Sequence, residues 1–235
     1  GNADIISGGS GDDIITGGEG DDIITGGSGA DTINVDKGTD TISDLGGTSG
    51  GESDILVVSK DAIAKATVKV SFTATSDTKN DAANAVDKAI ISTDADGATI
   101  DMSSAVGVYT LTGGDGVDKL TGSAGADTIN AGKGDDEITI AAAGKGDTDV
   151  MDGGDGTGDV LKLSTGKHTF ADDTKFKNIE KIETDASGSE VVLTAQKEAL
   201  EITGGDGVDK ITGGEGVDTI NAGKGDDEIT IAAAG

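Results

Sequence analysis

Aspartate recurs in this sequence at a fixed spacing, and its carboxylate could bind a cation. Asp13, Asp22 and Asp31 lie nine residues apart, and each closes a Gly-Gly-x-Gly-x-Asp run. The aspartates that share this register are Asp4, Asp13, Asp22, Asp31, Asp40, Asp118, Asp127, Asp136, Asp209, Asp218 and Asp227. Carboxylates are the oxygen ligands that hard divalent cations prefer, so a repeated carboxylate beside glycine predicts repeated cation sites.

The element that must position these aspartates is a nine-residue repeat. Residues 8–16 read GGSGDDIIT, 17–25 read GGEGDDIIT and 26–34 read GGSGADTIN. The glycines permit a tight turn over the first six residues, and the last three suit a short strand whose central isoleucine points inward. Two repeats then form one coil of about 18 residues, with two parallel sheets back to back. The sequence therefore predicts an all-β, right-handed parallel β-roll or β-helix solenoid.

The stacking of coils determines which cation would fit. Asp13 and Asp31 would lie on the same edge of successive coils, where two ionised carboxylates repel each other unless a cation lies between them. Calcium accepts six to eight oxygens from carboxylates and backbone carbonyls, whereas magnesium requires tight octahedral geometry and keeps its water. Zinc is disfavoured because the chain has no cysteine and only one histidine, His168. We expect several calcium ions, on the order of half a dozen from the paired turns.

Some aspartates lie outside the nine-residue register. For Asp54, Asp149 and Asp159, calcium binding and simple capping of a turn are equally open alternatives. Asp172-Asp173 and Asp226-Asp227 suggest paired carboxylates, but nothing around them indicates a catalytic cleft. We expect His168 to be a solvent-facing loop residue. No HExxH motif occurs, and we expect no enzyme activity.

The repeats divide the chain into three blocks separated by two intervening segments. We place the blocks at 1–43, 108–144 and 204–235. Residues 44–107 are a β-rich segment, in which 80–90 could form one short helix, and 145–203 carry further strands. The ranges 113–144 and 204–235 are nearly identical and lie 91 residues apart, which indicates a duplication. Because the second and third blocks are too short to fold alone, we expect one continuous body.

Composition restricts the setting in which the chain works. The net charge of −28 disfavours nucleic acid and anionic membrane surfaces as partners. No apolar run is long enough to span a membrane. The absence of cysteine excludes disulfides and suits a protein that stays unfolded during export. No signal peptide is visible, and the chain begins and ends within repeats, so we expect a piece of a larger protein.

The repeat consensus, GGxGxD followed by x, an apolar residue and x, resembles the RTX family of bacterial exported proteins. The resemblance implies that each calcium lies between turn n and turn n+2. One turn supplies its Asp and the carbonyls of its second and fourth residues, and the other its Asp and the carbonyls of its first and third. The implied second and fourth positions are Gly9, Gly11, Gly18, Gly20, Gly114, Gly116, Gly205 and Gly207. The implied first and third positions are Gly17, Glu19, Gly26, Ser28, Val35, Lys37, Ala131, Lys133, Ala222 and Lys224.

Two kinds of departure from the consensus occur at these positions. Val35, Ala131 and Ala222 replace the first glycine, and lysine takes the third place in the same three repeats. Because these positions would donate only carbonyls, we expect their side chains to be tolerated by pointing outward.

The resemblance also implies a biological role. The chain is most similar in style to RTX-type surface-layer proteins, which implies secretion through a type I channel, folding on calcium and a place on the bacterial cell surface. The implied partners are further copies in a lattice and cell-surface polysaccharide. Two alternatives remain: a segment of a large repeat adhesin, and the secretion and folding module of an exported enzyme or toxin.

Overall fold

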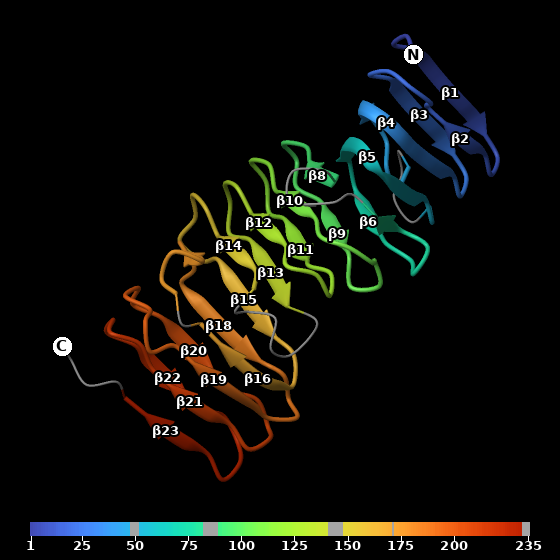
Figure 1. The fold of residues 1–235 in the computed structure, drawn as a ribbon. Helices are drawn as coiled ribbons and strands as arrows, with labels where there is room; N and C mark the ends of the chain where they lie inside the picture. The colour runs from blue at the N-terminus through green and yellow to red at the C-terminus, as the bar shows by residue number, and fades with distance from the viewer. Residues whose placement is uncertain (48–51, 82–88, 141–147, 171, 232–235) are drawn as a thin grey trace.

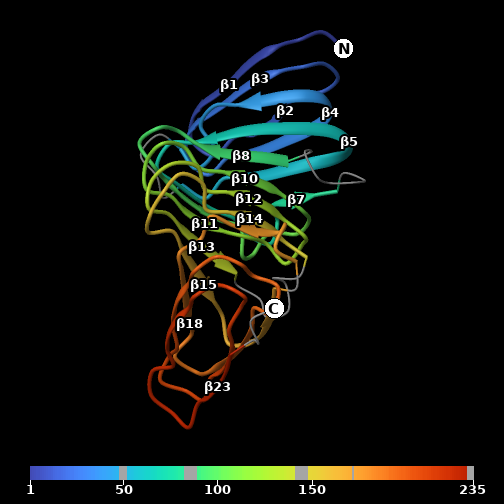
Figure 2. The same cartoon turned by 90° about the vertical axis from the view of Figure 1, so that its left-hand side faces the viewer.

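The computed structural model describes residues 1–47, 52–81, 89–140, 148–170 and 172–231. Every element within these ranges is a β-strand, and the strands form three sheets whose neighbouring members run parallel. The coils stack into an elongated solenoid, with β1 at one end and β23 at the other (Figure 1, Figure 2). The predicted all-β solenoid is therefore confirmed.

The largest sheet has 11 strands and the other two have eight and four. The first follows the order β1-β3-β4-β5-β8-β10-β12-β14-β17, with β2 paired to β4 and β7 to β5. Its strands are β1 (Ile5–Ser10), β2 (Ile14–Thr16), β3 (Ile23–Ser28), β4 (Thr32–Ile42), β5 (Ile55–Val68), β7 (Lys79–Asn80), β8 (Ala89–Thr93), β10 (Thr110–Thr112), β12 (Thr128–Asn130), β14 (Val150–Asp152) and β17 (Phe176–Lys177).

The other two sheets begin further along the chain, the eight-stranded sheet at β6 and the four-stranded sheet at β16. The eight-stranded sheet follows the order β22-β20-β18-β15-β13-β11-β9-β6 and the four-stranded sheet the order β16-β19-β21-β23. The eight strands are β6 (Ser71–Thr73), β9 (Thr99–Asp101), β11 (Lys119–Thr121), β13 (Glu137–Ile140), β15 (Val160–Leu163), β18 (Lys181–Thr184), β20 (Glu201–Thr203) and β22 (Thr219–Asn221). The four are β16 (Gly166–Thr169), β19 (Ser189–Val192), β21 (Lys210–Thr212) and β23 (Glu228–Thr230).

The register between strands follows the repeat. Ile5 pairs with Ile23 and Thr110 with Thr128, so two nonapeptides make one coil. Coils that pass through the intervening segments are longer, since Thr32 pairs with Ile55 and Ser71 with Thr99. Strand pairing continues through these longer coils, with a register shift between Val35 and Lys37 where β4 pairs with β5.

The core is a single column of apolar side chains along the solenoid axis. The eighth residue of each early repeat points into it, and Ile24, Ile33 and Ile42 are fully buried. The preceding residue points outward, as Ile14 and Ile23 show. Burying one such isoleucine contributes roughly 1.5–3 kcal/mol, so the column provides most of the apolar driving force.

The intervening segments belong to the same body as the repeat blocks. Strand β5 pairs with β4 of the first block and with β8, and β13 of the second block pairs with β15. The expectation of one continuous solenoid is confirmed. The helix considered over 80–90 falls mainly on residues outside the described ranges, while Lys79–Asn80 and the residues from Ala89 onward are strands. No helix within the described ranges could cross a membrane.

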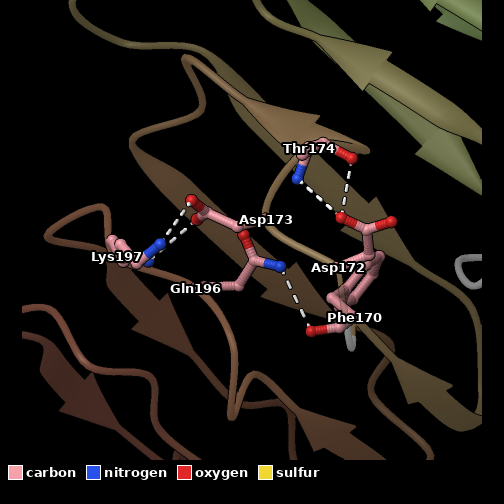
Figure 3. Close-up of polar contacts among 6 residues, drawn as sticks. All are labelled: Phe170, Asp172, Asp173, Thr174, Gln196 and Lys197. Carbon is pink, nitrogen blue, oxygen red and sulfur yellow. Dashed lines mark hydrogen bonds and ion pairs between the residues drawn. The ribbon is translucent and has the colours of Figure 1, made fainter. Parts of the chain in front are cut away.

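Corners outside the repeats are closed by side-chain contacts (Figure 3). Asp172 Oδ1 accepts hydrogen bonds from the Thr174 N–H and Oγ1 at 2.9 and 2.6 Å, which lower the pKa of Asp172. Asp173 instead pairs with the Lys197 ammonium at 3.2 Å, and Gln196 Nε2 donates to the Phe170 carbonyl at 3.1 Å. The two adjacent carboxylates thus have different partners.

Candidate metal centres

The aspartates of the repeat form two hydrogen-bonded ladders along the edges of the solenoid. The N–H of Asp13 donates to Oδ1 of Asp31 at 2.9 Å, and the N–H of Asp22 donates to Oδ1 of Asp40 at 3.1 Å. The same contact joins Asp4 to Asp22, Asp31 to Asp54, Asp118 to Asp136, Asp127 to Asp149, Asp136 to Asp159, and Asp209 to Asp227. The predicted stacking across 18 residues is therefore present, and each contact fixes one oxygen of the accepting carboxylate.

The second carboxylate oxygen has no partner in five of these aspartates. The buried Oδ2 atoms without a hydrogen bond belong to Asp13, Asp22, Asp40, Asp136 and Asp159. A buried carboxylate oxygen that accepts nothing is costly, because its hydration has been lost without replacement. A bound cation would supply the missing partner.

Two of these orphaned oxygens converge beside Gly17. A Cβ built on Gly17 would lie 2.7 Å from Asp40 Oδ2 and 2.8 Å from Asp22 Oδ2, so both oxygens face one point that only glycine leaves open. At Gly8 the corresponding neighbours are the Gly26 carbonyl at 2.6 Å and Asp13 Oδ2 at 2.7 Å. Carboxylates and a first-position carbonyl thus meet as calcium ligands would, given typical calcium–oxygen distances of about 2.3–2.6 Å.

Comparison with known proteins agrees with this geometry. The family model of the RTX calcium-binding nonapeptide repeat matches residues 1–33, 110–139 and 201–230 in four copies. This chain carries RTX calcium-binding repeats. Neither the curated proteins nor the solved structures contain a match to it. RTX nonapeptides are calcium-binding motifs, and three of the aspartates with orphaned oxygens, Asp13, Asp22 and Asp136, lie within the matched residues.

The donor set of the RTX turns suits calcium better than zinc. Within the described ranges, no three His, Cys, Asp or Glu side chains gather closely enough to hold a metal ion. A site here consists of two carboxylates and several backbone carbonyls, which match the oxygen-rich coordination of calcium. Zinc would require a closed set of nitrogen and sulfur ligands.

The RTX turns fall into two conformational classes. In open turns the second and fourth glycines have positive φ, as at Gly9 (107°) and Gly11 (102°). The same class includes Gly18, Gly20, Gly132, Gly134, Gly223 and Gly225. Gly27 and Gly29 in the turn of Asp31 are left-handed as well. Of these five open turns, those of Asp13, Asp22 and Asp136 have orphaned Oδ2 atoms.

In closed turns the aspartate caps its own loop. Asp118 Oδ2 accepts the Gly114 N–H at 2.8 Å, and Asp209 Oδ2 accepts the Gly205 N–H at 3.0 Å. The corresponding contacts are Ser123 to Asp127 at 2.6 Å and Gly214 to Asp218 at 2.9 Å. At these turns a calcium ion would have to share Oδ2 with this N–H or displace it. The open turns, whose Oδ2 atoms accept no such N–H, are better prepared to bind calcium.

The carbonyls implied as ligands lie on the turn edges, and several also accept hydrogen bonds. The Ser28 and Lys37 carbonyls accept the N–H groups of Gly11 (2.7 Å) and Gly20 (3.3 Å). In blocks two and three, the Gly114 and Gly205 carbonyls accept the N–H groups of Lys133 (2.9 Å) and Lys224 (3.0 Å). Each carbonyl oxygen has a second lone pair, so these contacts leave room for a cation.

The expectation that first-position side chains point outward is wrong. Val35 and Ala131 are fully buried, and Ala222 packs against the core. The reason is strand alternation, since Ile33 points in, Asn34 out and Val35 in again. Their carbonyls still reach the sites: a Cβ on Gly113 would contact the Ala131 carbonyl and lie 2.8 Å from Asp118 Oδ2.

The third-position lysines do point outward, and each bridges two turns. Lys37 pairs with Glu19 at 2.7 Å, and the corresponding pairs are Lys133 with Asp115 at 2.8 Å and Lys224 with Asp206 at 3.0 Å. These pairs are exposed, so they contribute little stability. They reduce the repulsion between turns that already carry stacked carboxylates.

The three off-register aspartates have different roles. Asp54 Oδ2 accepts the Gly46 N–H at 2.8 Å, which is turn capping. Asp149 and Asp159 each accept a ladder N–H, from Asp127 and Asp136, and the Oδ2 of Asp159 is orphaned. Sequence reasoning missed two further carboxylates, Asp44 and Glu180, because neither lies in a recognisable nonapeptide.

The charge on the ladders is electrostatically expensive without a cation. Burial, together with the neighbouring carboxylates of Asp118 and Asp159, raises the pKa of Asp136 to about 6. Burial likewise raises the pKa of Asp40, Asp54 and Asp159 above the ordinary value. A divalent cation would reverse this penalty, because opposite charge favours the ionised form.

His168 is a core residue, and its expected place in a solvent-facing loop is wrong. Its side chain lies on the inward face of β16 and is fully buried. The Nε2 atom lies 2.8 Å from the Ser164 carbonyl, which fits an Nε2–H donor, and Nδ1 has no partner. Burial lowers the pKa of His168 and favours the neutral ring.

Proposed function

We propose that this chain is a calcium-dependent structural protein of the bacterial cell surface, part of a secreted surface layer that folds and assembles on binding calcium. The observation that carries the proposal is the set of buried, unpartnered Oδ2 atoms on the ladder edges. Folding buries these oxygens away from water, and a bound calcium ion would replace their lost hydration. The free energy of calcium binding would therefore add to the free energy of folding.

The charge of the chain supports a link between folding and location. At a net charge of −28 the chain repels itself, so a compact state is disfavoured where calcium is scarce. Extracellular calcium modules have dissociation constants of about 10⁻⁴–10⁻³ M, so the chain would stay expanded in the cytosol and condense outside the cell. This behaviour suits export through a type I channel.

The shape supports a structural role. The solenoid is an elongated body (Figure 1). Stacked aspartates recur along its length, as in Asp13 with Asp31, Asp118 with Asp136 and Asp209 with Asp227. We propose further copies of the protein in a lattice, and cell-surface polysaccharide, as partners. We propose no catalytic role, since Asp172 and Asp173 have separate structural partners and His168 is buried.

The calcium-dependent fold is tested by circular dichroism with EGTA and with about 5 mM calcium, a concentration above the expected dissociation constants. We expect a disordered spectrum in EGTA and a β-rich spectrum in calcium. Magnesium at the same concentration is the control and should produce a smaller change, because it dehydrates reluctantly. Identical spectra in EGTA and calcium would exclude the proposal.

The surface-layer role is tested by electron microscopy of calcium-treated protein. Ordered two-dimensional sheets are expected. Isolated rods at every calcium concentration would contradict the lattice and favour a repeat adhesin or the folding module of an exported enzyme or toxin.

A further inference from the structure

One aspartate ladder continues past the residues that match the RTX repeat. It runs from Asp118 through Asp136 to Asp159, and the N–H of Asp159 then donates to Oε2 of Glu180 at 2.9 Å. Glu180 occupies the ladder position of a repeat aspartate, although no nonapeptide surrounds it. The spacing here is 21 residues, compared with 18 between Asp118 and Asp136.

Asn178 occupies the place of a first-position residue in the same corner. A Cβ built on Gly153 would contact the Asn178 carbonyl and lie 2.9 Å from Asp159 Oδ2. This arrangement repeats that of Gly8, whose neighbours are the Gly26 carbonyl and Asp13 Oδ2.

The backbone of Asn178 is held in an unusual conformation. Its φ of 50° makes it the one non-glycine residue with positive φ in the described part of the chain. Its Nδ2 donates to Asp152 Oδ1 at 2.7 Å, which fixes the side chain away from the corner. Left-handed backbone costs energy outside glycine and is found where the surroundings impose it, often at binding sites.

Asp159 provides the independent sign of a missing ligand. The residue is 1% exposed, and its Oδ2 is buried without a hydrogen-bond partner. The turn also fits closely around it, because a Cβ on Gly156 would lie 2.7 and 2.8 Å from its two carboxylate oxygens. Turn capping does not explain this aspartate, since a capping Oδ2 would accept an N–H of its own turn, as in Asp118.

We propose a further calcium site between the turn 153–159 and the corner 178–180, formed by Asp159 Oδ2, the Glu180 carboxylate and the Asn178 carbonyl. It rests on the proposed function, because it uses the same cation. The site joins the coil of β15 to the coil of β18 and extends the row of ions into an intervening segment. The intervening segment would then share the calcium dependence of the repeat blocks.

The first test counts calcium ions by equilibrium dialysis on the full chain. The variant Glu180→Gln keeps an oxygen for the Asp159 N–H but loses the charge, and we expect one ion fewer than in the unaltered protein. Glu201→Gln is the matched control, an exposed glutamate at the start of β20, and should leave the count unchanged. An unchanged count and affinity in Glu180→Gln would overturn the inference.

The second test does not depend on a variant that folds. Anomalous diffraction from crystals of the unaltered protein grown in calcium should show an ion beside Asp159, Glu180 and the Asn178 carbonyl. An empty corner with occupied nonapeptide turns would overturn this inference alone. A chain that binds no calcium at all would overturn the proposed function as well.

Discussion

At Asp22, Asp40, Asp136 and Asp159 the two oxygens of one carboxylate have different roles. Oδ1 accepts an N–H from the preceding coil, which sets the register, and the buried Oδ2 has no hydrogen-bond partner. Asp22 and Asp40 show this division most clearly, since both Oδ2 atoms are orphaned and both face the space beside Gly17. Removing the charge without removing the register is therefore possible by changing aspartate to asparagine.

The variant Asp22→Asn should weaken calcium binding on the edge of Asp22 and Asp40. We expect the calcium midpoint of folding to rise by on the order of tenfold, because ligand charge sets the affinity of calcium sites. Asp21→Asn is the control: it removes the same charge one residue away, from a side chain whose Oδ1 accepts the Thr39 N–H at the exposed surface. Circular dichroism at increasing calcium gives the midpoint of each variant. Equal midpoints for the two variants would contradict the assignment of Asp22.

The buried carboxylates also predict a dependence on pH in the absence of calcium. The folded-state pKa of Asp136, about 6, exceeds the ordinary value of 3.8, so the folded state binds more protons between these limits. The free energy of unfolding should therefore fall as pH rises through this window. Asp40 and Asp159, whose pKa values are also raised, act in the same direction as Asp136. The pKa of His168 is lowered, so protonation of His168 below pH 6.5 decreases the free energy of unfolding.

We therefore expect the calcium-free chain to be more structured at about pH 5 than at pH 7, and calcium to bind more weakly at about pH 5. Circular dichroism of the protein dialysed free of calcium at both pH values measures the first effect, and calcium titrations measure the second. Greater calcium-free stability at pH 7 would show that the ladder carboxylates are not the dominant titrating groups.

At the scale of the element, the turn rather than the strand distinguishes one coil from the next. The three-residue strands β10, β11 and β20 share one pattern, with an inward central residue and outward neighbours. The repeat turns differ, because some are open and others are closed by their own aspartate. Glycine determines how closely two turns approach. At Gly17 the missing Cβ leaves the space in which two carboxylate oxygens converge.

The variant Gly17→Ala should block this space. The new methyl group would lie 2.7 and 2.8 Å from the two orphaned oxygens, which is too close for a bound ion to keep its ligands. We expect one ion fewer by equilibrium dialysis. Gly122→Ala changes the same position of another repeat. Its methyl group would lie 3.1 Å from its nearest neighbour, Asp127 Oδ2, so this variant should affect calcium binding less. Equal losses in both variants would mean that the methyl group acts on folding in general.

At the scale of the whole molecule, the solenoid is stable only as a stack. The second block contributes β10, β11, β12 and β13. Each of these strands pairs with a strand of an intervening segment: β10 with β8, β11 with β9, β12 with β14 and β13 with β15. A three-repeat block alone would expose both of its ends. Repeats of this kind need neighbours to bury their apolar face.

An excised fragment of residues 108–144 should therefore remain unfolded even in saturating calcium, whereas residues 52–203 should fold. The measurement is circular dichroism at increasing calcium. A cooperative calcium-induced transition in the shorter fragment would show that the nonapeptides alone carry the stability.

The sequence by itself determined the fold class, the coil length and the edge on which the aspartates stack. These follow from local rules, because glycine spacing sets the turns and the alternation of isoleucine sets the inward face. It also indicated that intervening strands join the same body, since the short blocks could not bury their cores alone.

Only the tertiary structure decided which carboxylate oxygens remain without a partner. Whether an aspartate caps its own turn, as Asp118 does, or leaves Oδ2 free, as Asp136 does, depends on the coil stacked against it. The burial of His168 and the alignment of Glu180 with Asp159 likewise could not be predicted from the sequence. Both residues lie in a segment without a repeat, where the spacing along the chain does not predict the spacing in space.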